Sequence, residues 1–179
     1  PCFIYISKVD EENADYNVTF NALRERYGNR IAPVVVPIWD DNHKVTGIID
    51  VLNKRAFKMQ NLKRVEIPVP EGKESVITEF NDALAETREE FMDKFFGGAD
   101  FTYAEMIQGL NTGLVTRTLF PVLCGSGVTC LGSLMLMDHI LDLFPNPVEG
   151  NYHKATTADG KTEAFVVSPG GVPAAYVFK

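Results

Sequence analysis

The chain has 179 residues, of which 45% are hydrophobic and 23% are charged, and its formal net charge is −7. This composition is that of an ordinary globular protein, and its apolar runs are too short to cross a bilayer. The negative charge argues against direct binding to nucleic acid or to an anionic membrane surface, and it is compatible with a basic protein partner.

Cysteine and histidine residues do not form a ligand pattern. Cys2, Cys124 and Cys130 have no metal-like spacing near the scattered histidines, so we expect buried thiols in a reducing cytoplasm rather than a zinc site or disulfides. The sequence lacks a secretory signal and does not begin with Met, which leads us to expect an internal piece of a larger cytoplasmic protein.

The first half of the chain predicts strands on either side of a helix. Cys2–Ser7 is apolar on both faces, as in a buried parallel strand, and Asp15–Tyr27 has helical spacing that ends at Gly28. Three further strands are predicted, with an edge position for the proline-containing run: Pro33–Ile38, Val45–Leu52 and Lys63–Val69. A single amphipathic helix is then expected from Glu71 to Phe96.

The second half predicts another strand, loop and helix. Thr102 and Glu105 form a capping box that opens a helix running to about Thr116. Leu119–Cys124 predicts a buried strand, and the apolar positions from Leu131 to Phe144 predict an amphipathic helix.

The tail has a different character. Asp159-Gly160 is a two-residue hairpin signal, and Ala174–Lys179 predicts a lone strand, which we take as the start of a second, β-rich domain. Residues 1–33 and 118–148 therefore predict an α/β domain of the doubly wound type, interrupted by an α+β insertion at 34–117 and followed by a linker hairpin and first strand at 149–179.

Candidate binding residues follow the two buried strands. In open α/β sheets ligands bind at the carboxyl ends of the strands. There, Lys8 and Asp10 share one face of a segment that we expect to be extended, with Val9 packed inward. The Asp10 carboxylate can accept two parallel hydrogen bonds from guanine's ring N–H and amine. Gly125-Ser126-Gly127 follows the other strand, and its small residues let backbone N–H groups approach a carbonyl such as guanine O6.

The order of these motifs resembles the elongation factor G family of translational GTPases over essentially the whole chain. The segments that carry the resemblance are Ile6–Tyr16, Val36–Ile38, Gly47–Val51, Glu66–Pro68, Glu90–Lys94, Pro121–Ser126, Phe144–Pro147 and Ala175–Lys179. The resemblance implies the C-terminal half of a doubly wound P-loop GTPase domain, interrupted by that family's insertion subdomain and followed by the first strand of a β-barrel domain.

The resemblance also implies a guanine site. Asp10 would read the guanine edge, Lys8 would pack on the base, and the backbone of Ser126 and Gly127 would meet O6. Two residues depart from the family pattern, because Ser7 replaces an Asn and Gly127 replaces an Ala. A serine hydroxyl makes fewer hydrogen bonds than an asparagine amide, which is compatible with an elongation-factor-G-like paralogue.

No Gly-x-x-x-x-Gly-Lys-Ser/Thr motif occurs in the sequence, so no phosphate cradle is predicted within it. The resemblance implies that the full-length parent binds GTP and GDP with Mg²⁺ held by other segments, and hydrolyses GTP on the ribosome to drive translocation. We expect the fragment alone to be inactive.

The acidic helix has an additional interpretation through the resemblance, in which the insertion contacts the ribosomal stalk protein. The candidate docking residues, which we expect to face one way on one helix, are Glu86, Glu89, Glu90 and Asp93. Two alternatives stay open. One is a fragment of a tetracycline-resistance ribosomal protection protein, and the other is a protein-binding module without a nucleotide role.

Overall fold

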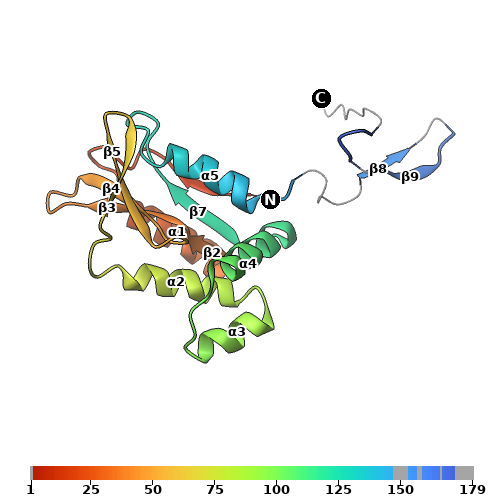
Figure 1. Ribbon diagram of the computed structural model, residues 1–179, viewed down its shortest axis with the longest axis horizontal. Coiled ribbons are helices and arrows are strands. Elements are labelled where there is room, and N and C mark those ends of the chain that lie inside the picture. Colours follow the sequence, from red (N-terminus) through yellow and green to blue (C-terminus); the bar gives the residue numbers. More distant parts are fainter. Residues whose placement is uncertain (1, 147–152, 157–158, 166, 172–179) are drawn as a thin grey trace. The chain divides into compact units, whose positions relative to one another are not determined.

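The computed structural model describes residues 2–146, 153–156, 159–165 and 167–171. These residues fall into two compact units, 1–144 and 145–179. The first unit contains a parallel sheet, an antiparallel sheet and five α-helices (Figure 1).

A three-stranded parallel sheet positions the candidate site. Its strands are β1 (Ile4–Ile6), β7 (Phe120–Cys124) and β2 (Ile31–Pro33), in the order β1-β7-β2. The central strand β7 is buried along most of its length, whereas all three β1 residues are only half-buried. The prediction of a fully buried first strand is therefore wrong for this unit, because β1 lies at the edge of the sheet with one neighbour.

Helices follow both strands that carry the candidate site. Asp15 caps α1 (Tyr16–Tyr27), since its Oδ1 accepts a hydrogen bond from Val18 N at 3.1 Å. The predicted start is confirmed, and α1 ends at Gly28 with a φ of 66° before the short 3₁₀ helix Gly28–Arg30. The helix α5 (Ser133–Leu143) follows β7.

The insertion contains a four-stranded antiparallel sheet in the order β3-β4-β5-β6. The strands are β3 (Val35–Trp39), β4 (Val45–Asp50), β5 (Arg55–Gln60) and β6 (Lys63–Ile67). The sequence did not predict β5, because polar residues interrupt its apolar positions.

The predicted strand Pro33–Ile38 is in fact the junction of the two sheets. Val34 donates to Val122 O at 2.9 Å in the parallel sheet and accepts from Val51 N at 3.0 Å in the insertion. The chain leaves the parallel sheet after Pro33 and enters the antiparallel sheet at Val35. The predicted edge position is confirmed, since both β2 and β3 are edge strands.

The predicted long helix is two helices, α2 (Glu74–Ala85) and α3 (Glu89–Phe96). Thr87 causes the break, because its backbone N and Oγ1 both donate to Leu84 O, at 3.0 and 2.7 Å. Arg88 is then extended, with φ −154° and ψ 144°. The prediction of one continuous helix is wrong.

The fourth helix begins as predicted. The capping box of Thr102 and Glu105 is present in α4 (Tyr103–Thr116), and it lowers the pKa of Glu105 to about 2 together with Lys94, whose hydrogen bond is the largest cause. The core of the unit includes Phe80, Leu84, Leu110 and Leu114, all fully buried. Through this core, α2 and α4 of the insertion pack against β2 and β7 of the parallel sheet.

The second unit holds the antiparallel hairpin of β8 (His153–Thr156) and β9 (Thr162–Phe165). The predicted hairpin is confirmed, and Gly160 has the positive φ, 75°, that its turn requires. The predicted lone strand Ala174–Lys179 lies outside the described residues. None of the described helices has the length and apolar character needed to cross a membrane.

Candidate guanine-recognition site

Parallel pairing brings the two predicted loops together. Ile6, the last residue of β1, lies opposite Cys124, the last residue of β7. Beyond the strands, Gly125 N donates to Ile6 O at 3.1 Å, and Val9 N donates to Gly125 O at 3.4 Å. The segment with Lys8 and the Gly125–Gly127 loop therefore form one structure at the carboxyl edge of the sheet.

The first loop is a turn and not the extended segment that the sequence predicted. Lys8 has a φ of 61°, a left-handed conformation that is uncommon for residues other than glycine. Glu11 N donates to Lys8 O at 3.2 Å and closes the turn. Val9 is 1% exposed, whereas Lys8 and Asp10 are exposed, so the expected inward and outward directions hold although the backbone differs.

A cavity of about 500 Å³ opens beside this turn. Its walls include Ser7 and Lys8 but not Asp10, which lies on the exposed side of the turn. Asn13 and Tyr16 also line it, and the sequence did not predict them as site residues. The Tyr16 hydroxyl is buried without a hydrogen-bond partner, and burial raises its pKa well above the ordinary value. The sequence signal that could have identified them is their position, because Asn13 lies shortly before the start of α1 and Tyr16 is its first residue.

The second loop is rigid around Ser126, which is 1% exposed. Its backbone N donates to Leu131 O at 2.8 Å, and its Oγ accepts from Val128 N at 3.1 Å and Thr129 N at 3.2 Å. The Ser126 N–H is therefore already satisfied within the protein. The neighbouring Gly127 is exposed, and its N–H makes no hydrogen bond within the part of the chain that the structure describes.

The glycines of this loop differ in their surroundings. A Cβ added to Gly125 would clash with Leu131 O and with the Tyr5 hydroxyl, so the backbone approaches its neighbours as only glycine allows. A Cβ added to Gly127 would meet nothing within 4 Å. Gly125 thus holds the two loops together, whereas the space beside Gly127 is open.

The four acidic candidates are exposed but do not share one helix face. Glu86 follows the end of α2, and its Oε1 accepts a hydrogen bond from Asn29 Nδ2 at 2.7 Å. Glu90 pairs with Arg88 at 3.0 Å. Glu89 and Asp93 are one helical turn apart in α3 and share a face. The break at Thr87 explains why the predicted single face is wrong.

The described residues contain no group of three or more His, Cys, Asp or Glu side chains placed to hold a metal ion. The two loops present the exposed carboxylates of Asp10, Glu11 and Glu12, the Lys8 ammonium and the exposed N–H of Gly127, groups that can hydrogen-bond to the edge of a base.

No family model matches the sequence. The chain is 30% identical over 179 residues, its full length, to an elongation factor G-like protein of Thermotoga maritima, of which it covers 26%. A crystal structure of a protein from Thermus thermophilus superimposes with a TM-score of 0.72 and 27% identity, over 83% of this chain and 23% of that protein. The chain thus spans about a quarter of the length of the relatives it matches, and the family resemblance predicted from the sequence is confirmed.

Proposed function

We propose that this chain, a homologue of elongation factor G-like proteins, is the guanine-recognising part of a ribosome-dependent translation GTPase. The observation that carries the proposal is the direct bonding of the Lys8 turn to the Gly125–Gly127 loop at the carboxyl edge of a parallel sheet. Ligands of open α/β sheets bind at such an edge.

In this proposal each loop supplies a different contact to the base. The exposed Asp10 carboxylate accepts from the ring N–H and the amine of guanine, and the Lys8 stem covers the base. The exposed N–H of Gly127 donates to O6, in place of the Ser126 N–H, which Leu131 already occupies. Ser7 lines the cavity, and its exposed hydroxyl is available to a ligand there.

GTP or GDP with Mg²⁺ is then bound in the full-length protein, with the phosphates and the metal held outside this chain. Two features support such a completion. Among the described residues the edge strand β1 pairs on one side only. Helix α5 carries four exposed apolar residues, Leu134, Met137, Ile140 and Leu141, with exposed fractions of 46%, 61%, 40% and 81%. A face of this kind is suited to packing against another part of a larger GTPase domain.

The isolated chain is expected to bind guanosine and GTP equally weakly, with dissociation constants of about 1 mM or more. The reason is that a bidentate base contact contributes only about 1–3 kcal/mol and this sequence has no phosphate-binding loop. The measurement is a titration followed through the backbone amide signals of Lys8, Gly127 and, as an internal reference, Leu62 in the distant β5–β6 turn.

Adenosine is the matched control, because it lacks guanine's paired donors and should leave the Lys8 and Gly127 signals unchanged. Micromolar binding of GTP would contradict the proposal that the phosphates are bound outside this chain. Equal responses to adenosine and guanosine would contradict guanine recognition itself.

A second candidate function is docking to a basic protein, for which the C-terminal domain of the ribosomal stalk protein is the proposed partner. The exposed, like-charged pair Glu89 and Asp93 on one face of α3 favours it. Glu86 and Glu90 would contribute at the margin, since one is bonded to Asn29 and the other to Arg88. Such docking would not distinguish a translation GTPase from a ribosomal protection protein or from a protein-binding module without a nucleotide role.

Charge reversal should slow this docking. The double variant Glu89→Lys, Asp93→Lys is expected to reduce the association rate about tenfold at low salt, and the loss should shrink as salt screens charges beyond about 8–10 Å. Stopped-flow mixing with labelled stalk domain measures the rate. The control, Glu25→Lys with Asp41→Lys, changes the net charge equally at exposed sites outside α3. Equal rates for the two double variants would rule out a specific role for α3.

A further inference from the structure

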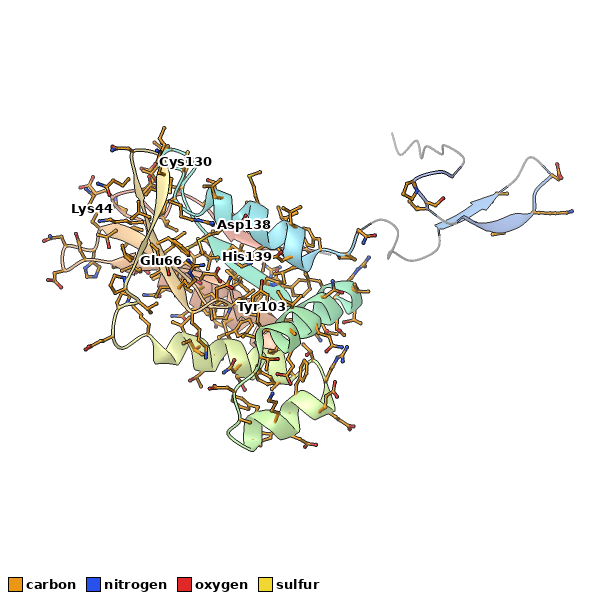
Figure 2. The ribbon with its side chains drawn as sticks, viewed as in Figure 1. Lys44, Glu66, Tyr103, Cys130, Asp138 and His139 are labelled. Atoms are coloured by element: carbon orange, nitrogen blue, oxygen red, sulfur yellow. The ribbon has the colours of Figure 1, made fainter. Side chains whose placement is uncertain are left out.

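A second cavity lies away from the guanine loops, between α5 and the insertion. Its volume is about 280 Å³, and residues from β4, β5, β6, α4 and α5 form its walls. Figure 2 shows Tyr103, Asp138 and His139 near one another, where α5 meets α4 and the antiparallel sheet of the insertion. None of the functions proposed above uses these residues.

His139 is the most unusual side chain of this cavity. It is 2% exposed, and neither ring nitrogen has a hydrogen-bond partner. Its Nε2 lies 3.7 Å from Oδ1 of Asp50, which is itself 6% exposed. Buried polar groups are normally hydrogen-bonded, so an imidazole with both nitrogens free beside a cavity indicates a missing partner.

The charges of the cavity walls are unbalanced. Arg64 pairs with Asp138 at 2.7 Å, and Arg55 pairs with Glu66, so both guanidinium groups already have carboxylate partners. Among the described residues neither Asp50 nor Asp142 forms an ion pair within 4 Å with a lysine or arginine, although the Arg55 guanidinium attracts Asp50 over a longer distance.

Their existing hydrogen bonds are all with neutral donors. The Asp50 carboxylate accepts from the backbone N and the Nδ2 of Asn53, at 3.2 and 2.8 Å. Asp142 Oδ2 accepts from the Tyr103 hydroxyl at 3.3 Å. The cavity therefore offers more acceptors and more negative charge than its own walls satisfy.

The protonation state of His139 fits this excess of acceptors. Burial lowers its pKa, outweighing Asp50, Asp142 and Asp138, which raise the pKa, while Arg64 lowers it further. The ring is accordingly neutral at neutral pH, and a neutral imidazole has one nitrogen that accepts a hydrogen bond.

The walls also include apolar side chains. Phe57 and Met135 are buried beside the cavity, and Leu141 is 81% exposed at its rim. Since one water in the liquid takes up about 30 Å³, the cavity has room for a group several carbons long in addition to a charged head. A cavity with both carboxylates and apolar side chains in its walls suits an alkylammonium ion.

We propose that this cavity binds a small organic cation with a primary ammonium group, which donates to the carboxylates of Asp50 and Asp142 and to a ring nitrogen of His139. The alkyl part packs on Met135 and Leu141, because the Arg55 and Arg64 guanidinium groups lie over the Phe57 ring, 5.3 and 5.0 Å from its centroid. An organic cation is chosen over a metal ion because the described carboxylates and histidines are not placed as metal ligands.

The probe for the test is n-butylammonium chloride, titrated at pH 7.5 and constant ionic strength into the complete chain. Long-range proton–nitrogen spectra of the histidine rings report whether His139 gains a partner. The expected result is a saturable shift of the His139 ring nitrogens with a millimolar dissociation constant, and no saturable shift with n-butanol, which has the same alkyl chain without the charge.

Asp142→Asn is the decisive variant, because the side chain is exposed and asparagine can still accept from Tyr103. Loss of one charge-assisted hydrogen bond should raise the dissociation constant about tenfold. The matched control is Glu25→Gln, an exposed carboxylate on α1, which should leave binding unchanged.

Three outcomes would overturn the proposal: no saturable shift at His139 with n-butylammonium, equal shifts with n-butanol, or unchanged binding in Asp142→Asn. An equal shift of the His139 ring nitrogens on addition of sodium chloride would indicate general charge screening, and it would also overturn the proposal. These results are independent of guanine recognition, because none of the residues concerned lines the cavity beside Lys8.

Discussion

Asp10→Asn in the full-length protein is expected to change the nucleotide preference from GTP to XTP by about 10⁴-fold or more. The carboxylate is exposed at the turn that bonds to the Gly125–Gly127 loop, where both of its oxygens can accept from guanine. An asparagine would place an NH₂ donor against guanine's own donors, whereas xanthine offers a carbonyl at that position.

The measurement is competition between labelled GTP and XTP for the wild type and the variant. Glu12→Gln is a matched control, because it removes another exposed carboxylate from the same loop, and it should leave the preference for GTP intact. If GTP binds to Asp10→Asn as tightly as to the wild type, Asp10 does not read the base.

The sequence predicted the elements with strong local signals. Asp15 and the pair Thr102 and Glu105 mark helix starts through side-chain bonds to nearby backbone groups, so the signal and its effect lie within four residues. The two loops could also be located, because each directly follows a strand that contacts the other in parallel.

The errors arose where a local interaction competes with periodicity. Thr87 ends α2 through two bonds to Leu84 O, although the apolar positions continue at helical spacing into α3. Lys8 adopts a left-handed backbone that its residue type does not favour, and tertiary bonds near Val9 compensate for it. Val34 belongs to a strand-like run, but its hydrogen bonds divide that run between two sheets.

The cavity around His139 could not be predicted from the sequence. Asp50, Tyr103 and His139 are far apart along the chain, and each belongs to a separate element whose pattern is ordinary. Only the packing of α5 on the insertion brings them together. A histidine on an amphipathic helix predicts either a core or a surface position, and its neighbours decide whether its nitrogens find partners.

The contrast between Gly125→Ala and Gly127→Ala should reveal how strongly the two guanine loops are joined. At Gly125 an added methyl group overlaps Leu131 O and the Tyr5 hydroxyl, so Gly125→Ala is expected to destabilise the chain by about 1–3 kcal/mol. At Gly127 the space is open and φ is not in the left-handed range, so Gly127→Ala is expected to stabilise the chain by up to about 1 kcal/mol by restricting the unfolded state.

Urea denaturation followed by circular dichroism gives both free energies of unfolding, and amide spectra locate the structural change. For Gly125→Ala the signals of Val9 and Leu131 should move, because Val9 N bonds to Gly125 O and Leu131 O faces the added methyl group. For Gly127→Ala the shifts should stay within the loop. Equal free energies of unfolding for the two variants would mean that the backbone at Gly125 can move away from Leu131 and Tyr5 without loss of stability. The contact between the two loops would then not determine the shape of the proposed guanine site.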